Sequence, residues 1–320
     1  MKLNRIALAA VCSVMALASL PAQAQNYPER PIKLIMPFPA GGAADVLARA
    51  VAQTMSPELG QQIYVENRPG AGGALGFGEA TKAAPDGYTI VWTSISLPVV
   101  AATIPTLNFD PKAYSHISKV AENPFVLVVN PQVPVKTVAE LVALAKSKPN
   151  GLNFAHNGTG TLTKLVLSLF AVEAGIELNE VSYRGDNFSS TDVLAGHVQG
   201  MFSNSPTALP HMASGGMRGL AVTSPKRSPA APDLPTMAEA GVKGVQAVIW
   251  HGISAPPGTP KPIIDKLNAA ANKALRNPEL VASFAKLGST AAGSTVAEYE
   301  KLNSDELAYW ADVAKKTAGK

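Results

Sequence analysis

The stretch IKLIMPFPAGGAADVLARAV, residues 32–51, decides the fold. Its first five residues are an apolar run of strand length that is bounded by prolines. Residues 45–55 follow, with Val46, Leu47 and Val51 on one face at helical spacing. A segment that contains two adjacent glycines joins the two parts. The stretch therefore predicts a strand, a tight loop and a helix, the unit from which α/β proteins are built.

The same alternation continues through most of the chain. Apolar runs of strand length are followed by segments of helical period, and turn signals or capping boxes separate them. This order favours an α/β architecture with mainly parallel sheets. Strands are expected at residues 62–66, 88–93, 125–130, 152–155, 181–184, 198–202, 220–223 and 246–255, and helices at 161–173, around 190–195 and twice after residue 260.

Two of the expected strands, residues 125–130 and 246–255, are placed to cross between domains. Both are apolar, and no flexible linker divides the chain. A length of 320 residues gives a prior of about two domains. We therefore expect a discontinuous first domain of residues 25–124 plus 248–320, and a second domain of residues 125–247.

The N-terminus has the composition of an export signal. Lys2 and Arg5 provide a positive start, residues 6–20 carry no charge, and residues 22–24 (AQA) form a small-x-small cleavage site. The uncharged run is shorter than the about 20 residues of a membrane span. The three residues before Cys12 make a poor lipoprotein box, which argues against a lipid anchor. We expect cleavage after Ala24 and a periplasmic protein.

Composition and motifs exclude several classes of function. The chain is 47% hydrophobic and 16% charged, so it is not disordered, and its net charge of +4 forms no basic stripe for nucleic acid. Cys12 is the single cysteine, and the five histidines lack metal-ligand spacing. No Gly-x-Ser-x-Gly elbow occurs, and the glycines of residues 68–76 miss the dinucleotide fingerprint by one residue. We expect no enzyme, cofactor or metal site.

Two glycine loops offer a different chemistry. Residues 38–45 (FPAGGAAD) and 157–161 (NGTGT) each join an expected strand to an expected helix. Glycine lets a ligand approach the backbone, and a helix N-terminus has unpaired amides with about half a positive charge. Both loops are therefore natural anion sites. The alternative is that they are ordinary turns, with Asp45 and Thr161 as N-caps.

Ordered motifs make the resemblance specific. The segments YPERPI (27–32), PFPAGG (37–42), VENRPGAGG (65–73) and APDGYT (84–89) resemble the receptors of tripartite tricarboxylate transporters, the Bug family of periplasmic solute-binding proteins. Further on, YRG (183–185), AVTS (221–224) and APPGTP (255–260) continue the match in order. The resemblance covers essentially the whole chain after the export signal.

The resemblance implies a fold, a function and a set of ligand residues. The fold is α/β with two domains of the periplasmic-binding-protein type (type II-like, Venus flytrap) and crossing strands between the domains. Such receptors close a cleft on a small carboxylate, held largely by backbone amides and bridging waters, without catalysis. The ligand residues expected here are Phe38, Ala40, Gly41, Gly42, Asp45, Thr93, Ser94, Asn157, Gly158, Thr159, Gly160, Thr161, Asp192 and Asn204.

Departures from the family pattern concern the charge of the cleft. Lys164 stands where the family commonly has histidine, and Ser203 stands where an aspartate often precedes Asn204. Asp186 and Asn187 follow the YRG motif as a further departure. If Lys164 and Ser203 face the ligand, the cleft is less negative and favours a more anionic ligand. The alternative is that Lys164 points to solvent.

The sequence thus predicts the ligand-capture component of a secondary carboxylate uptake system. It would be a monomer that binds a small carboxylate and passes it to membrane permease subunits. The alternative is a periplasmic sensor subunit that binds a similar ligand for a signalling partner, and an enzyme ranks third. Whether the ligand is a mono-, di- or tricarboxylate, an amino acid or an aromatic acid stays open.

Overall fold

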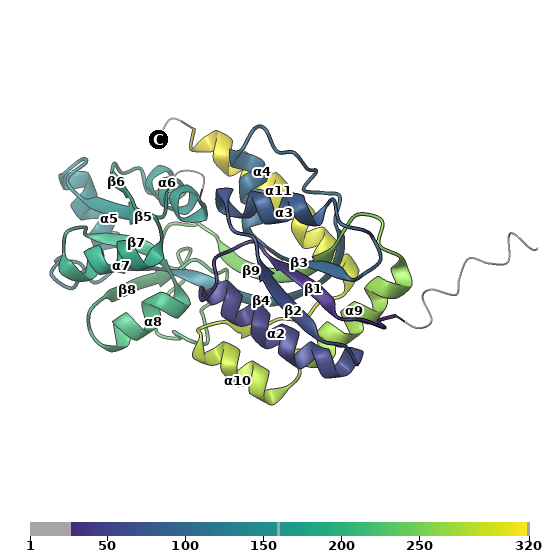
Figure 1. Cartoon of the computed structure of the whole chain (residues 1–320). Helices are drawn as coiled ribbons and strands as arrows, with labels where there is room; N and C mark the ends of the chain where they lie inside the picture. The colour runs from purple at the N-terminus through teal and green to yellow at the C-terminus, as the bar shows by residue number, and fades with distance from the viewer. Residues whose placement is uncertain (1–26, 159–160, 319–320) are drawn as a thin grey trace, which may run out of the picture.

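A continuous β-sheet runs through the molecule (Figure 1). The structure is a computed structural model that describes residues 27–158 and 161–318. The strand order is β2-β1-β3-β9-β4-β7-β5-β6, and β8 and β10 also pair with β4. The strands are β1 (Ile32–Met36), β2 (Ile63–Asn67), β3 (Thr89–Ser94), β4 (Ser115–Val129), β5 (Asn153–His156), β6 (Asn179–Ser182), β7 (Gly200–Asn204), β8 (Arg218–Val222), β9 (Val248–Ala255) and β10 (Thr290–Ala291).

Strand β4 joins two domains. Residues 115–124 pair with β9, whereas residues 125–129 pair with β7 and β8. Domain 1 contains the strands on the β9 side of this change, and domain 2 contains β5 to β8. The fold is therefore the expected two-domain α/β flytrap with crossing strands. We propose that the domain boundary falls between Pro124 and Phe125, as predicted.

The crossing strands are antiparallel to their neighbours. The chain enters domain 2 along β4 and returns along β9, so the two strands run in opposite directions and pair antiparallel. The parallel pairs are β1 with β2 and β3, and β5 with β6 and β7. The expectation of mainly parallel sheets is thus right within each domain and wrong at the crossing.

The helices lie on both faces of the sheet. In Figure 1, α3, α4 and α11 are on one side of the domain 1 strands, and α2 and α10 are on the other. Glu298 and Thr295 form a reciprocal capping box at the start of α11. The helices are α2 (Ala43–Leu59), α3 (Ala74–Ala80), α4 (Ser96–Thr103), α5 (Val138–Ser147), α6 (Leu162–Ala174), α7 (Asp186–Ala195), α8 (Ser205–Ala213), α9 (Lys261–Ala274), α10 (Pro278–Lys286) and α11 (Val296–Lys316).

The hydrophobic core is shared between the domains on one face of the hinge. One cluster lies within domain 1, between β1, α2 and α9. Another contains Phe125 and Leu127 of domain 2 together with Trp250, Tyr299 and Trp310. The domains are therefore packed together on the α11 side, so any closure has to pivot about this shared cluster.

The predicted export signal, residues 1–24, lies outside the described residues. Within the ranges that the structure covers, none of the helices combines the length and the apolar character needed to cross a membrane.

Candidate ligand-binding site

Strand ends from both domains meet at one short segment of β4. Ser94, the last residue of β3, pairs with His251 of β9, which pairs with Ala121 of β4. Asn204, the last residue of β7, pairs with Phe125 of β4. Strands β1 and β5 run parallel to β3 and β7. The loops after β1 and β5 thus lie at carboxyl ends of strands beside the hinge, where open α/β sheets bind ligands.

Asp45 holds the domain 1 loop from inside. Its buried carboxylate accepts hydrogen bonds of 2.9 Å from the Gly41 amide and from Arg49 Nε. Asn67 Nδ2 donates to the other carboxylate oxygen and to the Phe38 carbonyl oxygen, both at 2.9 Å. Burial raises the pKa of Asp45, but these three donors outweigh it and hold the pKa below its usual value. The Gly41 amide and the Asp45 carboxylate are therefore engaged within domain 1.

The N-cap of α2 is Gly42, not Asp45. The alternative of an Asp45 cap is wrong because its carboxylate reaches back to Gly41 instead of to an amide of the helix. No side chain caps the first turn of α2, and Ala40, Gly41 and Gly42 are exposed. Gly41 has a φ of +79°, which favours glycine, whereas Gly42 has an ordinary φ of −73°.

The structure does not bring the Thr93 hydroxyl to the loops. Thr93 is fully buried, and its hydroxyl lies 2.6 Å from Tyr299 Oη and 3.0 Å from Ser254 Oγ. Ser94 is also buried, and its Oγ accepts from the Ser96 amide at 3.2 Å. Thr93 therefore ties β3 to α11, while Ser94 stands at the strand end beside the hinge.

The domain 2 loop is tied to the start of α6. Thr161 is the N-cap, and its Oγ1 donates to the Gly158 carbonyl oxygen at 2.6 Å. The Asn157 amide donates to Thr163 Oγ1 at 2.9 Å, and the Gly158 amide donates to His156 Nδ1 at 3.1 Å. The predicted ligand residues Thr159 and Gly160 lie outside the described residues. The hydroxyls of this loop shape its backbone.

Asn204 and Asp192 lie in different surroundings. Asn204 is the N-cap of α8, and its Oδ1 is buried without a hydrogen-bond partner among the described residues. Asp192, further along α7, accepts from Tyr183 Oη at 2.6 Å, a bond that lowers the pKa of the carboxyl group. Asn204 therefore keeps an acceptor at the strand ends, whereas Asp192 is engaged with the end of β6.

The departures from the family pattern contact other groups of domain 2. Lys164 forms an ion pair with Glu180 of β6, so it does not point freely to solvent. Ser203 is fully buried and faces Asp186, whose side chain brings a carboxyl group to the same place. The expectation that the substitutions favour a more anionic ligand stays a prediction.

Sequence reasoning missed Asn67 and Asp186 as residues of the two loops' surroundings. Asn67 lies in the VENRPGAGG segment that carries the resemblance, so that motif contained a signal for it. Its role became visible only when β2 was placed next to β1, which brings Asn67 level with Met36. Asp186 follows the YRG motif, and only the packing of α7 against β7 and β5 places its carboxyl group.

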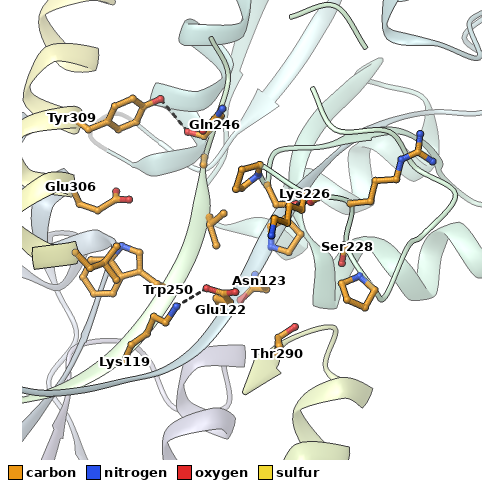
Figure 2. A pocket seen from close by; sticks show the side chains of 18 of the residues that line it. Lys119, Glu122, Asn123, Lys226, Ser228, Gln246, Trp250, Thr290, Glu306 and Tyr309 are labelled. Carbon is orange, nitrogen blue, oxygen red and sulfur yellow. Dashed lines mark hydrogen bonds and ion pairs between the residues drawn. The ribbon is translucent and has the colours of Figure 1, made fainter. Parts of the chain in front are cut away.

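A cavity of about 550 Å³ lies on the flank of the hinge (Figure 2). It opens between α11 and residues 224–229, and both crossing strands line it. Trp310 Nε1 donates to Glu306 at 2.6 Å, and Trp250 Nε1 is buried without a partner among the described residues. None of the expected ligand residues that the structure describes lines this cavity.

The part of the chain that the structure describes contains no group of three or more His, Cys, Asp or Glu side chains that could hold a metal ion.

Comparisons with known proteins cover nearly the whole chain. Residues 47–318 match the sequence profile of the Tripartite tricarboxylate transporter family receptor. BugT of Bordetella pertussis is 37% identical over 303 residues, which are 94% of this chain and 93% of BugT.

Two solved structures are similar in fold and sequence. MatC from Rhodopseudomonas palustris, with bound malate, has a TM-score of 0.78 and 30% identity over 90% of this chain and all of its own. Rpa4515 from R. palustris, with adipate, has a TM-score of 0.82 and 31% identity over 91% of this chain and 98% of its own. The protein described here therefore belongs to the tripartite tricarboxylate transporter receptors, the Bug family of periplasmic solute-binding proteins.

Proposed function

We propose that this protein captures a small carboxylate between its two domains and delivers it to the permease subunits of a tripartite tricarboxylate-type transporter. The observation that carries the proposal is that β3 and β7 end at one segment of β4, and that β1 and β5, which pair with them in parallel, lead into the two glycine loops. Each loop opens a helix of more than two turns, α2 or α6. Relatives with about the same fold bind malate and adipate.

The proposed roles of the site residues follow from their contacts. Backbone amides of the first turns of α2 and α6 would bind the ligand, because helix N-termini attract anions. Exposed Ala40 and Gly42 allow close approach in domain 1. Asn157 and Asn204 supply polar side chains from domain 2. Four of the expected residues would hold the backbone in place without contacting the ligand through their side chains: Gly41, Asp45, Thr93 and Thr161.

Closure of the cleft follows from binding at two loops. A ligand that contacts α2 of domain 1 and α6 of domain 2 makes interactions in a closed form that an open form cannot make. This differential affinity shifts the population toward closure. Small-angle scattering should therefore show a smaller radius of gyration with saturating ligand, and an unchanged profile would count against a closing cleft.

The binding function is tested by a thermal-shift screen of mono-, di- and tricarboxylates, amino acids and aromatic acids, followed by calorimetry. A ligand at 100 times its dissociation constant should stabilise the protein by about 2.7 kcal/mol. Inorganic sulfate serves as a control for nonspecific anion effects. If no carboxylate raises the melting temperature more than sulfate does, the proposed function is wrong.

Export and delivery need separate tests. The proposed cleavage after Ala24 predicts that mass spectrometry of the protein from a periplasmic extract finds Gln25 as the first residue. Delivery predicts that deletion of the gene abolishes uptake of the identified carboxylate, and that deletion of the permease subunits does the same. Normal uptake without the receptor would contradict the transport role.

A further inference from the structure

Asp186 has a buried carboxyl group without a partner. It is the first residue of α7, directly after the N-cap Gly185. Neither carboxyl oxygen is accessible to solvent, and neither has a hydrogen-bond partner among the described residues. Burial raises the pKa of this carboxyl group. A buried carboxyl group that lacks donors is costly in its ionised form, so this position calls for an explanation.

The carboxyl group lies next to the domain 2 ligand loop. Three side chains face it, and each lowers its pKa against the effect of burial, although none of their contacts has the geometry of a hydrogen bond: Asn157 from that loop, Ser203 from β7 and Thr207 from α8. Ser189 Oγ donates to Asn157 Oδ1 at 3.2 Å, which leaves the amide nitrogen of Asn157 for Asp186. The charge of Asp186 therefore acts directly on the loop at which an anion would bind.

The charged groups around Asp186 do not neutralise it. His211 of α8 faces it and lowers its pKa slightly, as the least of the effects of its neighbours. From β5, His156 accepts a hydrogen bond from the Gly158 amide, and burial lowers the pKa of this imidazole, which favours its neutral form. Lys164 of α6 is paired with Glu180 of β6. The N-terminus of α7 favours an ionised Asp186, yet burial has the larger effect.

We propose that Asp186 determines which ligands are accepted by charge: it takes up a proton when an anionic group binds beside Asn157 at the start of α6, and it stays ionised when a neutral group binds there. The proton comes from solvent and adds to a carboxyl oxygen of Asp186. Two negative charges in a buried site cannot both persist, so one must be neutralised. The inference rests on the proposed function, and it narrows the preferred ligand at neutral pH to carboxylates with a neutral second end.

Matched ligands test the proposal. Adipate and its monoamide, adipamate, have the same length and differ by one negative charge. Calorimetry in two buffers of different ionisation enthalpy should show uptake of a fraction of a proton with adipate and less with adipamate. In Asp186→Asn, the uptake with adipate should disappear, and the affinity for adipate relative to adipamate should rise about tenfold, the effect of one unit of pKa.

Asp265→Asn on α9, whose carboxylate is exposed and pairs with Lys261, is the matched control and should keep the proton uptake of the parent. Equal proton uptake in the parent and in Asp186→Asn would overturn the proposal. If neither ligand binds either protein although other carboxylates do, the experiment uses the bound carboxylate and its monoamide. If no carboxylate binds at all, the proposed function itself is wrong and the inference falls with it.

A measurement without ligand distinguishes a failure of this inference from a failure of the proposed function. If Asp186 is ionised at a cost in the folded protein, Asp186→Asn should melt at a higher temperature than the parent near pH 8, with the difference vanishing below about pH 4, the ordinary titration range of an aspartate. A constant difference across this range would show that Asp186 does not carry a costly charge, whatever the ligand. If Asp186→Asn does not fold, Asp186→Ser provides the same comparison of melting temperatures with the parent.

Discussion

Two aspartates begin helices beside the hinge, and their surroundings are opposite. Asp45, in the first turn of α2, receives hydrogen bonds from an amide, a guanidinium group and a carboxamide, and its pKa is lowered. Asp186, at the start of α7, has no partner among the described residues, and burial raises its pKa. Both side chains are turned into the protein, so exposure does not account for the difference.

This difference in hydrogen bonding supports different roles for the two domains at the proposed ligand site. In domain 1 the donors are already in place, and the loop of residues 37–42 has its shape before any ligand arrives. In domain 2 a charge is left uncompensated, so its state can respond to what binds. A preorganised side gives affinity at low cost in entropy, and a responsive side gives selection between ligands.

The largest expected effect is that of removing Asp45. Asp45→Ala leaves the Gly41 amide and Asn67 Nδ2 without their acceptor and removes the ion pair with half-exposed Arg49. Because buried groups that lose a charged partner are costly, we expect a loss of about 3 kcal/mol in the free energy of unfolding. Urea denaturation measures it.

Asp186→Ala is the matched comparison for Asp45→Ala. It removes a carboxylate at the start of a helix as well, but one that accepts no hydrogen bond from the described residues. The change should therefore cost far less than Asp45→Ala. If both variants lost the same free energy of unfolding, the difference in hydrogen bonding between the two aspartates would make no difference to stability.

Affinity should respond most to Gly42. Its φ of −73° suits any residue, and a β-carbon there would meet only the Pro39 carbonyl oxygen at 3.5 Å. Gly42→Val should therefore leave a folded protein but block the approach of a ligand to the first turn of α2. We expect at least about a 100-fold loss of affinity, or about 2.7 kcal/mol, by calorimetry.

Gly41→Ala separates strain from access. Gly41 has a φ of +79° but open space around it, so alanine should cost about 1 kcal/mol of stability through backbone strain. Its effect on affinity should be smaller than that of Gly42→Val. Unchanged affinity in Gly42→Val would show that the first turn of α2 is not the ligand contact.

The sequence predicted the strands, loops and helices that position the two aspartates better than it predicted the partners of their carboxyl groups. Strand, loop and helix periodicity located both glycine loops, because side-chain patterns report which face of an element is buried. The start of β4 was missed, since Ser118, Lys119 and Asn123 interrupt the apolar pattern of a strand that is nevertheless largely buried. Polar side chains are buried there because they form hydrogen bonds within the protein. Ser118 Oγ, for example, donates to the Ser294 carbonyl oxygen.

The partners of the two aspartates could not be read from the sequence. Asn67 reaches Asp45 from 22 positions away, through the pairing of β1 with β2. Asp186 was noted only as a departure from a motif, and its surroundings depend on how α7 packs against β7 and β5. Whether a carboxylate is satisfied is a property of three-dimensional neighbours, which residue types and spacing do not encode.

The pH dependence of stability should have opposite signs for the two residues. The lowered pKa of Asp45 means that its contribution is present above the ordinary value for aspartate and is lost as the pH falls through the folded value. The raised pKa of Asp186 means that a penalty develops as the pH rises above the ordinary value for aspartate and is complete above the folded value. At pH 7, Asp45→Asn should therefore melt below the parent and Asp186→Asn above it.

Both differences should shrink toward pH 3, where both carboxyl groups are increasingly protonated. Melting temperatures at five pH values between 3 and 8 are sufficient to see this. Two differences of the same sign at pH 7 would refute the assignment of one satisfied and one unsatisfied aspartate.

The smallest expected effect extends the comparison to two tryptophans that line the hinge cavity, Trp250 and Trp310, of which Figure 2 labels Trp250. The Trp310 indole donates to Glu306 at 2.6 Å, whereas the Trp250 indole nitrogen has no partner among the described residues. Trp310→Phe removes a donor from a buried carboxyl group whose pKa burial already raises, so it should cost more than the loss of ring area alone.

Trp250→Phe removes an N–H group that has no hydrogen-bond partner among the described residues, and it keeps an aromatic ring against Tyr299. Both changes remove the same ring area, so the difference between the two variants isolates the hydrogen bond, and we expect it to be about 1 kcal/mol by urea denaturation. Because phenylalanine keeps most of the packing on the crossing strand, Trp250→Phe should also leave the ligand-induced change in scattering intact. A larger loss for Trp250→Phe than for Trp310→Phe would mean that the hinge depends on the packing of the crossing strand more than on the satisfaction of its polar groups.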